Sequence, residues 1–345
     1  MTKRIVIATV GLVLLAGFAF AGAQGEVAEA EEGPQNIVLS ISTIAAPDSS
    51  QVKAANRFKL EIERVTQGRI SADVYSAGQI FTQEGELAAA REGTLDIANY
   101  AASWVAEFVP YLGQLGAVYT FSSYQHMRNA LSDEGIWGQM IEDVSDAIGV
   151  VPLIPLYLGT RQLNLVESVG PVRHPDDMQG VKLRTPNSPS WIALGKALGG
   201  SPTPLSFGEV YMALRTGVVE GQDNPLNTDV IQKFYEPTKY IILTDHVVDT
   251  VWPSINKARW ESFSEEDQAI ILDAWEVARE FNDQLVLERE AEARAFMEGE
   301  GIIFIEDPDK DAFIEYAKWS YQNESQGVSG DWDWDFYEMI QARRP

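Results

Sequence analysis

The chain has 345 residues, no cysteine, and 51 acidic against 26 basic side chains, which gives a formal net charge of −25 at pH 7. The lack of cysteine excludes disulfides, a thiol nucleophile and cysteine metal sites. Nucleic-acid binding requires a basic surface, so we expect no nucleic-acid partner. On so acidic a chain, an anion site must carry its own local positive charge.

Residues 1–21 are typical of an export signal. Lys3 and Arg4 precede an uncharged apolar run, and Ala19-Phe20-Ala21 fits the small-x-small rule for cleavage. The apolar run is shorter than the about 20 residues of a membrane-spanning helix, so an uncleaved anchor is the less favoured alternative. Because a lipoprotein cysteine is lacking, we expect a periplasmic protein without a lipid anchor. Residues 22–36 are small and acidic, and we expect a disordered leader there.

From residue 37 onward, strand-like and helix-like segments alternate. Residues 37–43, 70–75 and 95–100 have strand patterns, and residues 51–66 and 83–92 between them have helical patterns. This β-α-β-α-β order predicts an α/β fold with parallel strand pairing.

The middle of the chain continues in the same manner and predicts a second α/β lobe. The expected elements are strands at residues 150–158, 181–185, 218–222 and 240–243, a short helix that begins at Pro175 and Asp176, and helices at residues 188–198 and 207–215.

A long helical pattern follows at about residues 265–297. Ser262-Phe263-Ser264-Glu265 resembles a capping box at its start. A helix of this length extends about 50 Å, which is too long for one small lobe, so we expect it to brace two. A strand at residues 302–305 and a helix at residues 310–321 complete the pattern.

The most informative segment is residues 158–227. It contains G-T-R at residues 159–161, G-V-K-L-R-T-P-N at residues 180–187 and PTPLSFGEVYMALRTGVVEGQDNP at residues 202–225. A weaker match, TQGRISADVYSAGQ, lies at residues 66–79. In order and spacing these motifs resemble the DctP-type solute-binding proteins of TRAP (tripartite ATP-independent periplasmic) transporters, and the likeness extends over nearly the whole chain after the signal.

The resemblance implies an α/β, two-lobed periplasmic solute-binding protein with a ligand cleft between its lobes and a long helix spanning both. In this chain lobe I is expected at residues 37–158, completed by parts of 250–345, and lobe II at 159–249. The long helix would occupy residues 264–298, and residues 299–345 would pack back on the lobes. The resemblance further implies a monomer without cofactor or catalysis that delivers its ligand to TRAP membrane permease subunits driven by an ion gradient.

Two arginines are the first candidates for ligand binding. Arg184 matches the arginine that pairs with the ligand carboxylate in this family, and Arg161 is similar to a second arginine that reaches the ligand in some members. A guanidinium offers two parallel N–H donors that fit a carboxylate and keeps its charge. For Arg184 a surface salt bridge is the alternative interpretation, and for Arg161 the alternative is an ion pair between the lobes or on the surface.

Six further residues are expected to contact the ligand. Asn187 and Asn224 match hydrogen-bonding positions of the family, although both adjoin proline and turn chemistry is an alternative. Phe207 resembles the aromatic residue that packs on the ligand. Trp191 fits either the cleft wall or the core. Asn99 and Tyr100 follow a strand of the first lobe, and we place them on the opposite wall.

The ligand predicted from these side chains is a small carboxylate with hydroxyl groups, such as a uronate or an aldonate. A C4-dicarboxylate and a 2-oxo or hydroxy acid remain alternatives within the family. An exported α/β hydrolase or lyase is the alternative of a different class. His126, His174 and His246 are widely spaced, and we find neither a G-x-S-x-G elbow nor a named metal-ligand cluster.

Overall fold

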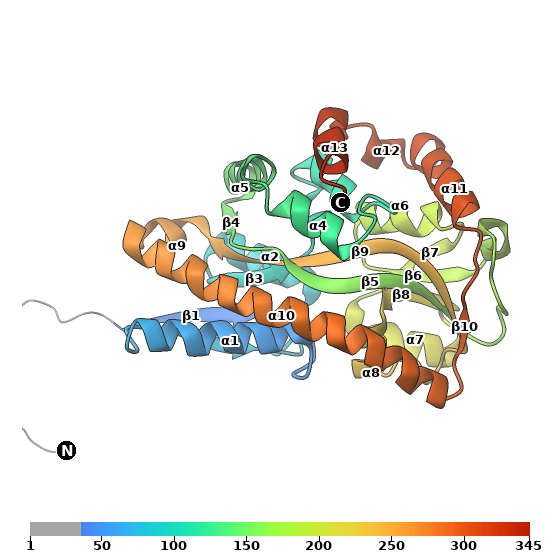
Figure 1. The fold of residues 1–345 in the computed structure, drawn as a ribbon, viewed down its shortest axis with the longest axis horizontal. Coiled ribbons are helices and arrows are strands. Elements are labelled where there is room, and N and C mark those ends of the chain that lie inside the picture. Colours follow the sequence, from blue (N-terminus) through green and yellow to red (C-terminus); the bar gives the residue numbers. More distant parts are fainter. Residues whose placement is uncertain (1–35) are drawn as a thin grey trace, which may run out of the picture. The chain divides into compact units, whose positions relative to one another are not determined.

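The computed structural model describes residues 36–345, whose strands join in one sheet (Figure 1). The predicted signal, residues 1–21, and the predicted leader up to residue 35 lie outside the described residues. The strands are β1 (Ile37–Ser42), β2 (Ile70–Tyr75), β3 (Ile97–Tyr100), β4 (Val150–Pro152), β5 (Leu156–Leu165), β6 (Lys182–Thr185), β7 (Ser201–Pro204), β8 (Gly221–Pro225), β9 (Tyr240–Asn256) and β10 (Ile303–Ile305).

The sheet has the order β2-β1-β3-β9-β5-β8-β6-β7, and both β4 and β10 pair with β9. We call β2, β1, β3 and β4 with the C-terminal end of β9 the first half-sheet. The second half-sheet comprises β5, β8, β6, β7 and β10 with the rest of β9. Strands β1, β2 and β3 pair in parallel, as the β-α-β-α-β pattern predicted.

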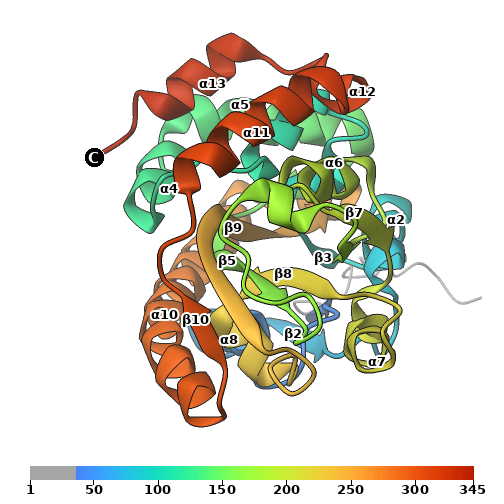
Figure 2. The same ribbon diagram turned by 90° about the vertical axis from the view of Figure 1, so that its right-hand side faces the viewer.

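Helices cover both half-sheets (Figures 1 and 2). They are α1 (Ser50–Val65), α2 (Gln83–Glu92), α3 (Ala102–Val105), α4 (Tyr124–Leu131), α5 (Glu134–Ile148), α6 (Pro189–Ala197), α7 (Val210–Thr216), α8 (Leu226–Ile231), α9 (Lys257–Glu261), α10 (Glu265–Gly299), α11 (Lys310–Asn323), α12 (Gln326–Ser329) and α13 (Trp334–Gln341). Short 3-10 helices occupy Pro110–Gly116, Pro175–Met178 and Phe207–Glu209.

Three strand predictions were wrong in extent. The strand predicted at residues 218–222 is β8, which begins at Gly221 and ends at Pro225. The segment at residues 150–158 is divided between β4 and β5, because Pro155 interrupts the ladder before β5 continues to Leu165. The strand predicted at residues 240–243 is β9, which has 17 residues. Its polar residues and Pro253 are locally unfavourable in a strand, but pairing with β3, β4, β5 and β10 along its length outweighs local propensity.

Helix α10 has 35 residues, which corresponds to about 52 Å. It runs past α1 and β5 to α8 (Figure 1). Its N-cap is Ser264, whose Oγ accepts from the backbone N–H of Asp267 (3.1 Å), so the predicted capping box beginning at Ser262 was misplaced. Near its start Trp275 stacks on Phe58 of α1 with ring centroids 4.3 Å apart.

Farther along, α10 holds β5 at a β-bulge between Tyr157 and Gly159. The Asp283 carboxylate accepts from the backbone N–H of Tyr157 (3.0 Å), and Glu290 accepts from that of Thr160 (2.6 Å). Gly159 has φ +126°, and an added Cβ would lie 2.5 Å from Pro225 Cβ. The bulge therefore requires glycine, and it fixes β5 just before Arg161.

The C-terminal helices lie on the far side of the sheet from α10 (Figure 2). Helix α11 contacts α6, and α13 contacts α4 and α5. His126 of α4 joins this layer through an Nε2 contact of 2.9 Å to the Ile340 carbonyl oxygen. The chain end is thereby attached to helices of both half-sheets.

Glu86 of α2 has a carboxyl group that is buried between this helix and the first half-sheet. It is 1% exposed and accepts a hydrogen bond from Ser42 Oγ (2.8 Å), at the end of β1. Burial raises the pKa of Glu86 to about 8, against the weaker opposing effect of the Ser42 bond. The side chain is therefore neutral in the folded protein at pH 7, where an unfolded chain would ionise it.

We predict that Glu86→Gln makes stability less dependent on pH. The folded pKa is raised, so the wild-type protein loses stability as pH rises from 4.5 to about 8 and changes little above. At pH 8 the variant should be more stable by roughly 3–5 kcal/mol, measured by urea unfolding between pH 5 and 9. Glu92→Gln, an exposed change on the same helix, should retain the wild-type pH dependence. Parallel curves for Glu86→Gln and wild type would contradict the assignment.

Candidate functional site

A cavity lies between the two half-sheets, and several of its residues follow the C-terminal ends of parallel strands, where α/β proteins place ligands. One wall comes from the first half-sheet and its helices: Thr43, Ile44, Ala45, Ser49, Ser50, Gln51, Gln83, Asn99, Tyr100, Ala101 and Trp104. The other wall comes from the second half-sheet, its helices and β9: Leu158, Arg161, Arg184, Pro186, Trp191, Phe207, Asn224, Asn227, Thr228, Ile231, Gln232, Asp249, Thr250 and Val251.

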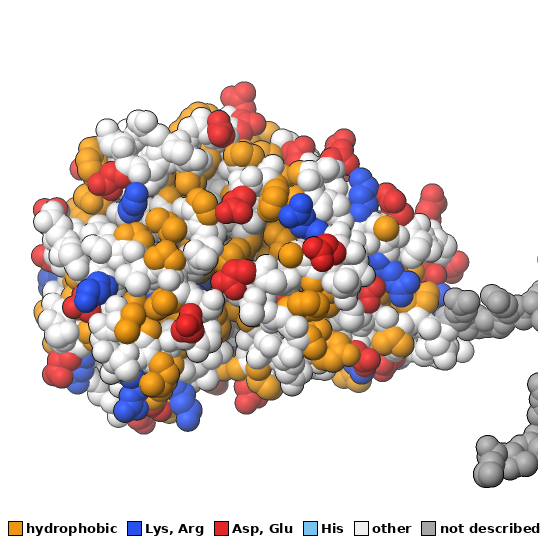
Figure 3. Space-filling view, turned by 180° about the vertical axis from the view of Figure 1, so that it is seen from behind, with side chains coloured by type: hydrophobic (Ala, Val, Ile, Leu, Met, Phe, Trp, Pro, Cys, Tyr) orange, Lys and Arg blue, Asp and Glu red, His pale blue; other side chains and the backbone are white. Residues whose placement is uncertain are grey.

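Most charged side chains are on the surface. On the face drawn in Figure 3, acidic and basic side chains are interspersed with small hydrophobic patches. The buried charged residues include a group around the second wall of the cavity: Arg161, Arg184, Asp223, Asp229 and Asp249. The local positive charge that an anion site needs is therefore separate from the acidic surface.

Arg184 projects from β6 and is 2% exposed. Its Nε and Nη2 donate to the Leu205 carbonyl oxygen (3.0 and 2.8 Å), and its guanidinium carbon lies 5.8 Å from the centre of the Phe207 ring. Within residues 36–345 no carboxylate forms a salt bridge with it. Burial lowers the pKa of Arg184 to about 10. A bound anion would offset the cost of this desolvated charge.

Arg161 of β5 is, by contrast, paired within the protein. Its Nε donates to Asp249 Oδ2 (2.7 Å), and its Nη1 lies 3.2 Å from Asp223 Oδ2. Burial acts to lower the pKa of Arg161, but Asp249 and Asp223 together raise it. The guanidinium carbon stacks 4.4 Å from the centre of the Trp191 ring. Arg161 is thus held rigidly at the cavity wall with most of its charge compensated.

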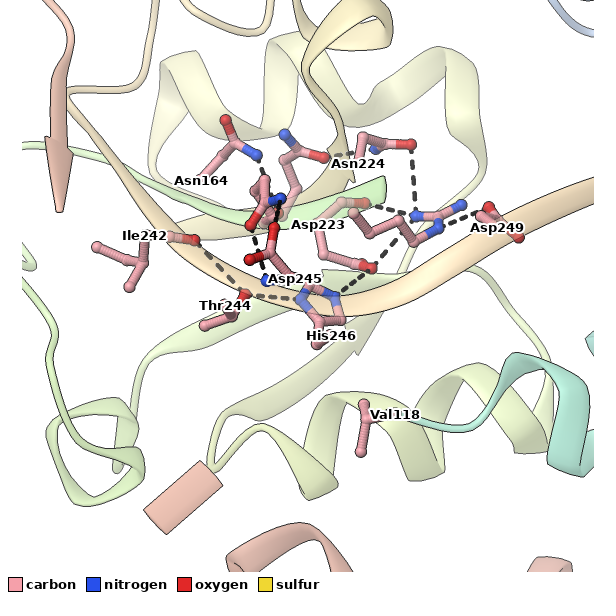
Figure 4. A network of polar contacts seen from close by, with 12 residues as sticks. Val118, Asn164, Asp223, Asn224, Ile242, Thr244, Asp245, His246 and Asp249 are labelled. Atoms are coloured by element: carbon pink, nitrogen blue, oxygen red, sulfur yellow. Dashed lines mark hydrogen bonds and ion pairs between the residues drawn. The ribbon is translucent and has the colours of Figure 1, made fainter. Parts of the chain in front are cut away.

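The two aspartates have different environments. Asp223 also contacts His246 Nε2 (3.2 Å), and Arg161 and His246 lower its pKa although burial opposes them. For Asp249, burial outweighs Arg161 and raises the pKa. Figure 4 shows Asp223 between Asn224 and His246, with Asp249 beside them at the end of the network.

Behind this wall, polar side chains of β8 continue the network. Asn224 donates to Gln222, which donates to Asp229 Oδ1 of α8 (2.8 Å). Burial raises the pKa of Asp229 well above its ordinary range. A chain of neutral and charged groups therefore fixes the orientation of the Asn224 side chain at the cavity.

The first wall is polar but uncharged. Thr43 Oγ1 donates to Gln51 (3.3 Å), and Asn99 Nδ2 donates to the Ser42 carbonyl oxygen (3.0 Å). Gln83 Oε1 is buried without a hydrogen-bond partner in the part of the chain that the structure describes, and so is Trp191 Nε1 on the other wall. Buried polar atoms of this kind are normally satisfied by water or ligand.

The structure brings seven of the eight predicted ligand residues to this cavity: Arg184, Arg161, Asn224, Phe207, Trp191, Tyr100 and Asn99. Asn187 is exposed between β6 and α6 and lies outside the lining. Sequence reasoning did not find Gln83, Asp249 or the residues after β1. Asp249 could have been predicted from one feature of the sequence: it is a charged residue within an apolar segment, and a charged residue in a buried strand is seldom unpaired.

Groups typical of metal or histidine chemistry are not assembled here. Among residues 36–345 no group of three or more His, Asp or Glu side chains could hold a metal ion. The ring of His174 accepts from the Asp176 backbone N–H at a helix start, and His246 bridges Thr244 and Asp223.

No helix in residues 36–345 is long and apolar enough to cross a membrane.

We predict that Asp223→Ala strongly destabilises the protein. It removes one of the two carboxylate partners of Arg161 and the carboxylate partner of His246, from a side chain with no exposed surface, and breaking a buried ion pair costs roughly 3–5 kcal/mol. Asp307→Ala, which breaks the exposed pair with Arg173, should cost about 1 kcal/mol or less. Urea unfolding of both variants measures the difference. Equal stabilities would contradict the network described above.

Comparison with known proteins gives consistent matches. The sequence profile described as bacterial extracellular solute-binding protein, family 7 (DctP), matches residues 41–326. The sialic acid-binding periplasmic protein SiaP of Vibrio cholerae is 31% identical over 265 residues, 76% of this chain and 81% of its own length.

Two solved structures of TRAP periplasmic solute-binding proteins from Roseobacter denitrificans are also similar. One holds 3-deoxy-D-manno-oct-2-ulosonic acid, with a TM-score of 0.83 and 33% identity over 90% of this chain and all of the other. The second holds L-galactonate, with a TM-score of 0.80 and 28% identity over 90% of this chain and 99% of the other. These matches confirm the family resemblance and the fold class predicted from the sequence.

Proposed function

This chain belongs to the DctP family of bacterial extracellular solute-binding proteins, and on that basis we propose that it captures a small hydroxylated organic acid in the cavity between its half-sheets. In this proposal it works in the periplasm and delivers the acid to TRAP membrane permease subunits driven by an ion gradient. The two half-sheets are the cores of its lobes, with boundaries near residues 158 and 250, and α10 spans both.

Arg184 carries the proposal. It is a buried guanidinium that lines the cavity, and within residues 36–345 it has no carboxylate partner. A carboxylate of the ligand would provide the missing counter-charge and accept two parallel hydrogen bonds. Arg161 would contribute from the same wall, but with a charge that Asp249 and Asp223 already compensate. We therefore assign the main carboxylate contact to Arg184.

The rest of the lining supports a ligand with hydroxyl groups. Asn99, Asn224 and Gln83 offer amide donors and acceptors, which suit hydroxyls that both donate and accept. Trp191 and Phe207 offer apolar faces for the carbon skeleton. The relatives described above bind or are named for L-galactonate, 3-deoxy-D-manno-oct-2-ulosonic acid and sialic acid, all polyhydroxylated acids. We therefore propose a sugar acid as the ligand.

We predict that Arg184→Ala weakens binding of any carboxylate ligand by at least about 2 kcal/mol, roughly 30-fold in Kd, because a buried charged partner is lost. Arg215→Ala removes the same charge from an exposed position of α7 and should leave Kd unchanged. Isothermal titration of both variants measures the effect. Wild-type affinity in Arg184→Ala would refute the assignment.

A thermal-shift screen tests the ligand class. A ligand at about 100 times its Kd stabilises the folded protein by roughly 2.7 kcal/mol, so aldonates and uronates should raise the melting temperature clearly. The matched uncharged sugars, such as D-galactose for D-galactonate, should not. Stabilisation by uncharged sugars alone would refute carboxylate capture. Chemical conversion of the bound acid, followed by NMR, would instead indicate an exported hydrolase or lyase.

A further inference from the structure

The charged side chains that line the cavity are few. They are Arg161, Arg184 and Asp249, and together they carry one positive charge. Asp223 stands behind Arg161 and compensates it further. After this internal pairing, Arg184 is the one lining guanidinium that lacks a carboxylate partner within the described residues.

We propose that the cavity selects acids with a single carboxylate over dicarboxylates of equal length, and that Asp249 is the residue that sets this selectivity. The inference rests on the proposed function, because it takes capture of one carboxylate by Arg184 as its starting point. It extends that function by excluding the C4-dicarboxylates and aldarates, which carry a carboxylate at each end.

The first carboxylate uses the one guanidinium that is free to pair. A second carboxylate in the same cavity would be desolvated without a matching cation and would be repelled by Asp249, which is itself 4% exposed. Burying an unpaired carboxylate weakens binding by a hundredfold or more in order of magnitude. The cavity therefore discriminates by charge as well as by shape.

The start of α1 is the strongest feature that would favour a second anion. Ser49, Ser50 and Gln51 line the cavity there, and a helix N-terminus attracts negative charge. The effect amounts to at most about fivefold in affinity at an ordinary helix end. Ser49 Oγ already accepts from the Val52 backbone N–H, so one of the free N–H groups at the start of α1 already has a partner. The attraction of this helix end therefore does not offset the cost of burying an unpaired carboxylate.

Hydroxyl groups fit the remaining acceptors better than a carboxylate does. Gln83 Oε1 is buried without a partner among residues 36–345, and it needs a donor. The Asp249 carboxylate accepts from Arg161 and from the Thr250 backbone N–H, and its oxygens retain lone pairs. A ligand hydroxyl donates to such atoms, whereas an ionised carboxylate has no proton to donate.

Matched pairs of acids test the proposal by isothermal titration at pH 7. The pairs are D-galactonate with galactarate and D-gluconate with D-glucarate, which differ only in oxidation of the last carbon. In the pair whose monoacid binds wild type more tightly, the diacid should bind at least about a hundredfold more weakly than the monoacid. Asp249→Asn should reduce that ratio by about tenfold. The substitution removes the repelling charge and leaves Arg161 with one carboxylate partner, Asp223, so that its positive charge is less compensated.

Asp245→Asn is the matched control, since it removes one negative charge from a half-exposed position of the same strand; it should leave the ratio as in wild type. Equal or tighter binding of the diacid by wild type overturns the inference while carboxylate capture stands. If no acid of either pair binds, the proposed function and the inference fail together. A wild-type ratio in Asp249→Asn overturns the role of Asp249, and if that variant does not fold, the wild-type ratio still decides whether the cavity selects monoacids.

Discussion

The pairing of β5 with β9 is the constraint on which the site depends. Strand β9 pairs with β3 at its C-terminal end and with β5 over the rest of its length, so the two half-sheets form one continuous sheet. The register sets Gly159 opposite Asp249, with Arg161 two residues farther along β5. The ladder itself thus brings the buried arginine and its aspartate together, and the bulge held by Glu290 of α10 fixes their position.

Two buried arginines in one cavity serve different purposes. Arg161 has aspartate partners and an aromatic face, which makes it part of a rigid wall. Within residues 36–345 Arg184 donates to a carbonyl oxygen but forms no salt bridge, and burial lowers its pKa, so the folded protein retains a buried charge without an ion-pair partner. Such a charge is unfavourable for stability and is typical of functional sites. The difference between the two arginines depends on neighbours far along the chain, and their local sequences do not reveal it.

Local pattern predicted β2 and α2 at their observed bounds, because hydrophobic period and stop signals coincide there. The motif around Arg184 and Asn224 located one wall of the cavity. The other wall was harder, since Thr43, Gln51 and Gln83 come together only through tertiary packing. Likewise, the local sequence predicts only a short strand for β9, because Asp245, Asp249 and Pro253 are unusual in strands. In the structure each of these residues has a partner distant in sequence.

The position of β3 in the sheet has a consequence for how the chain folds. Its residue Ile97 pairs with Ile255, so the first half-sheet is completed by a strand that lies more than a hundred residues later. Contacts of such sequence separation close slowly, because the loop entropy is lost before the contact forms. Until β9 has been synthesised, β3 lacks the neighbour that it has in the native sheet, and we expect the first half-sheet to be completed only after that point.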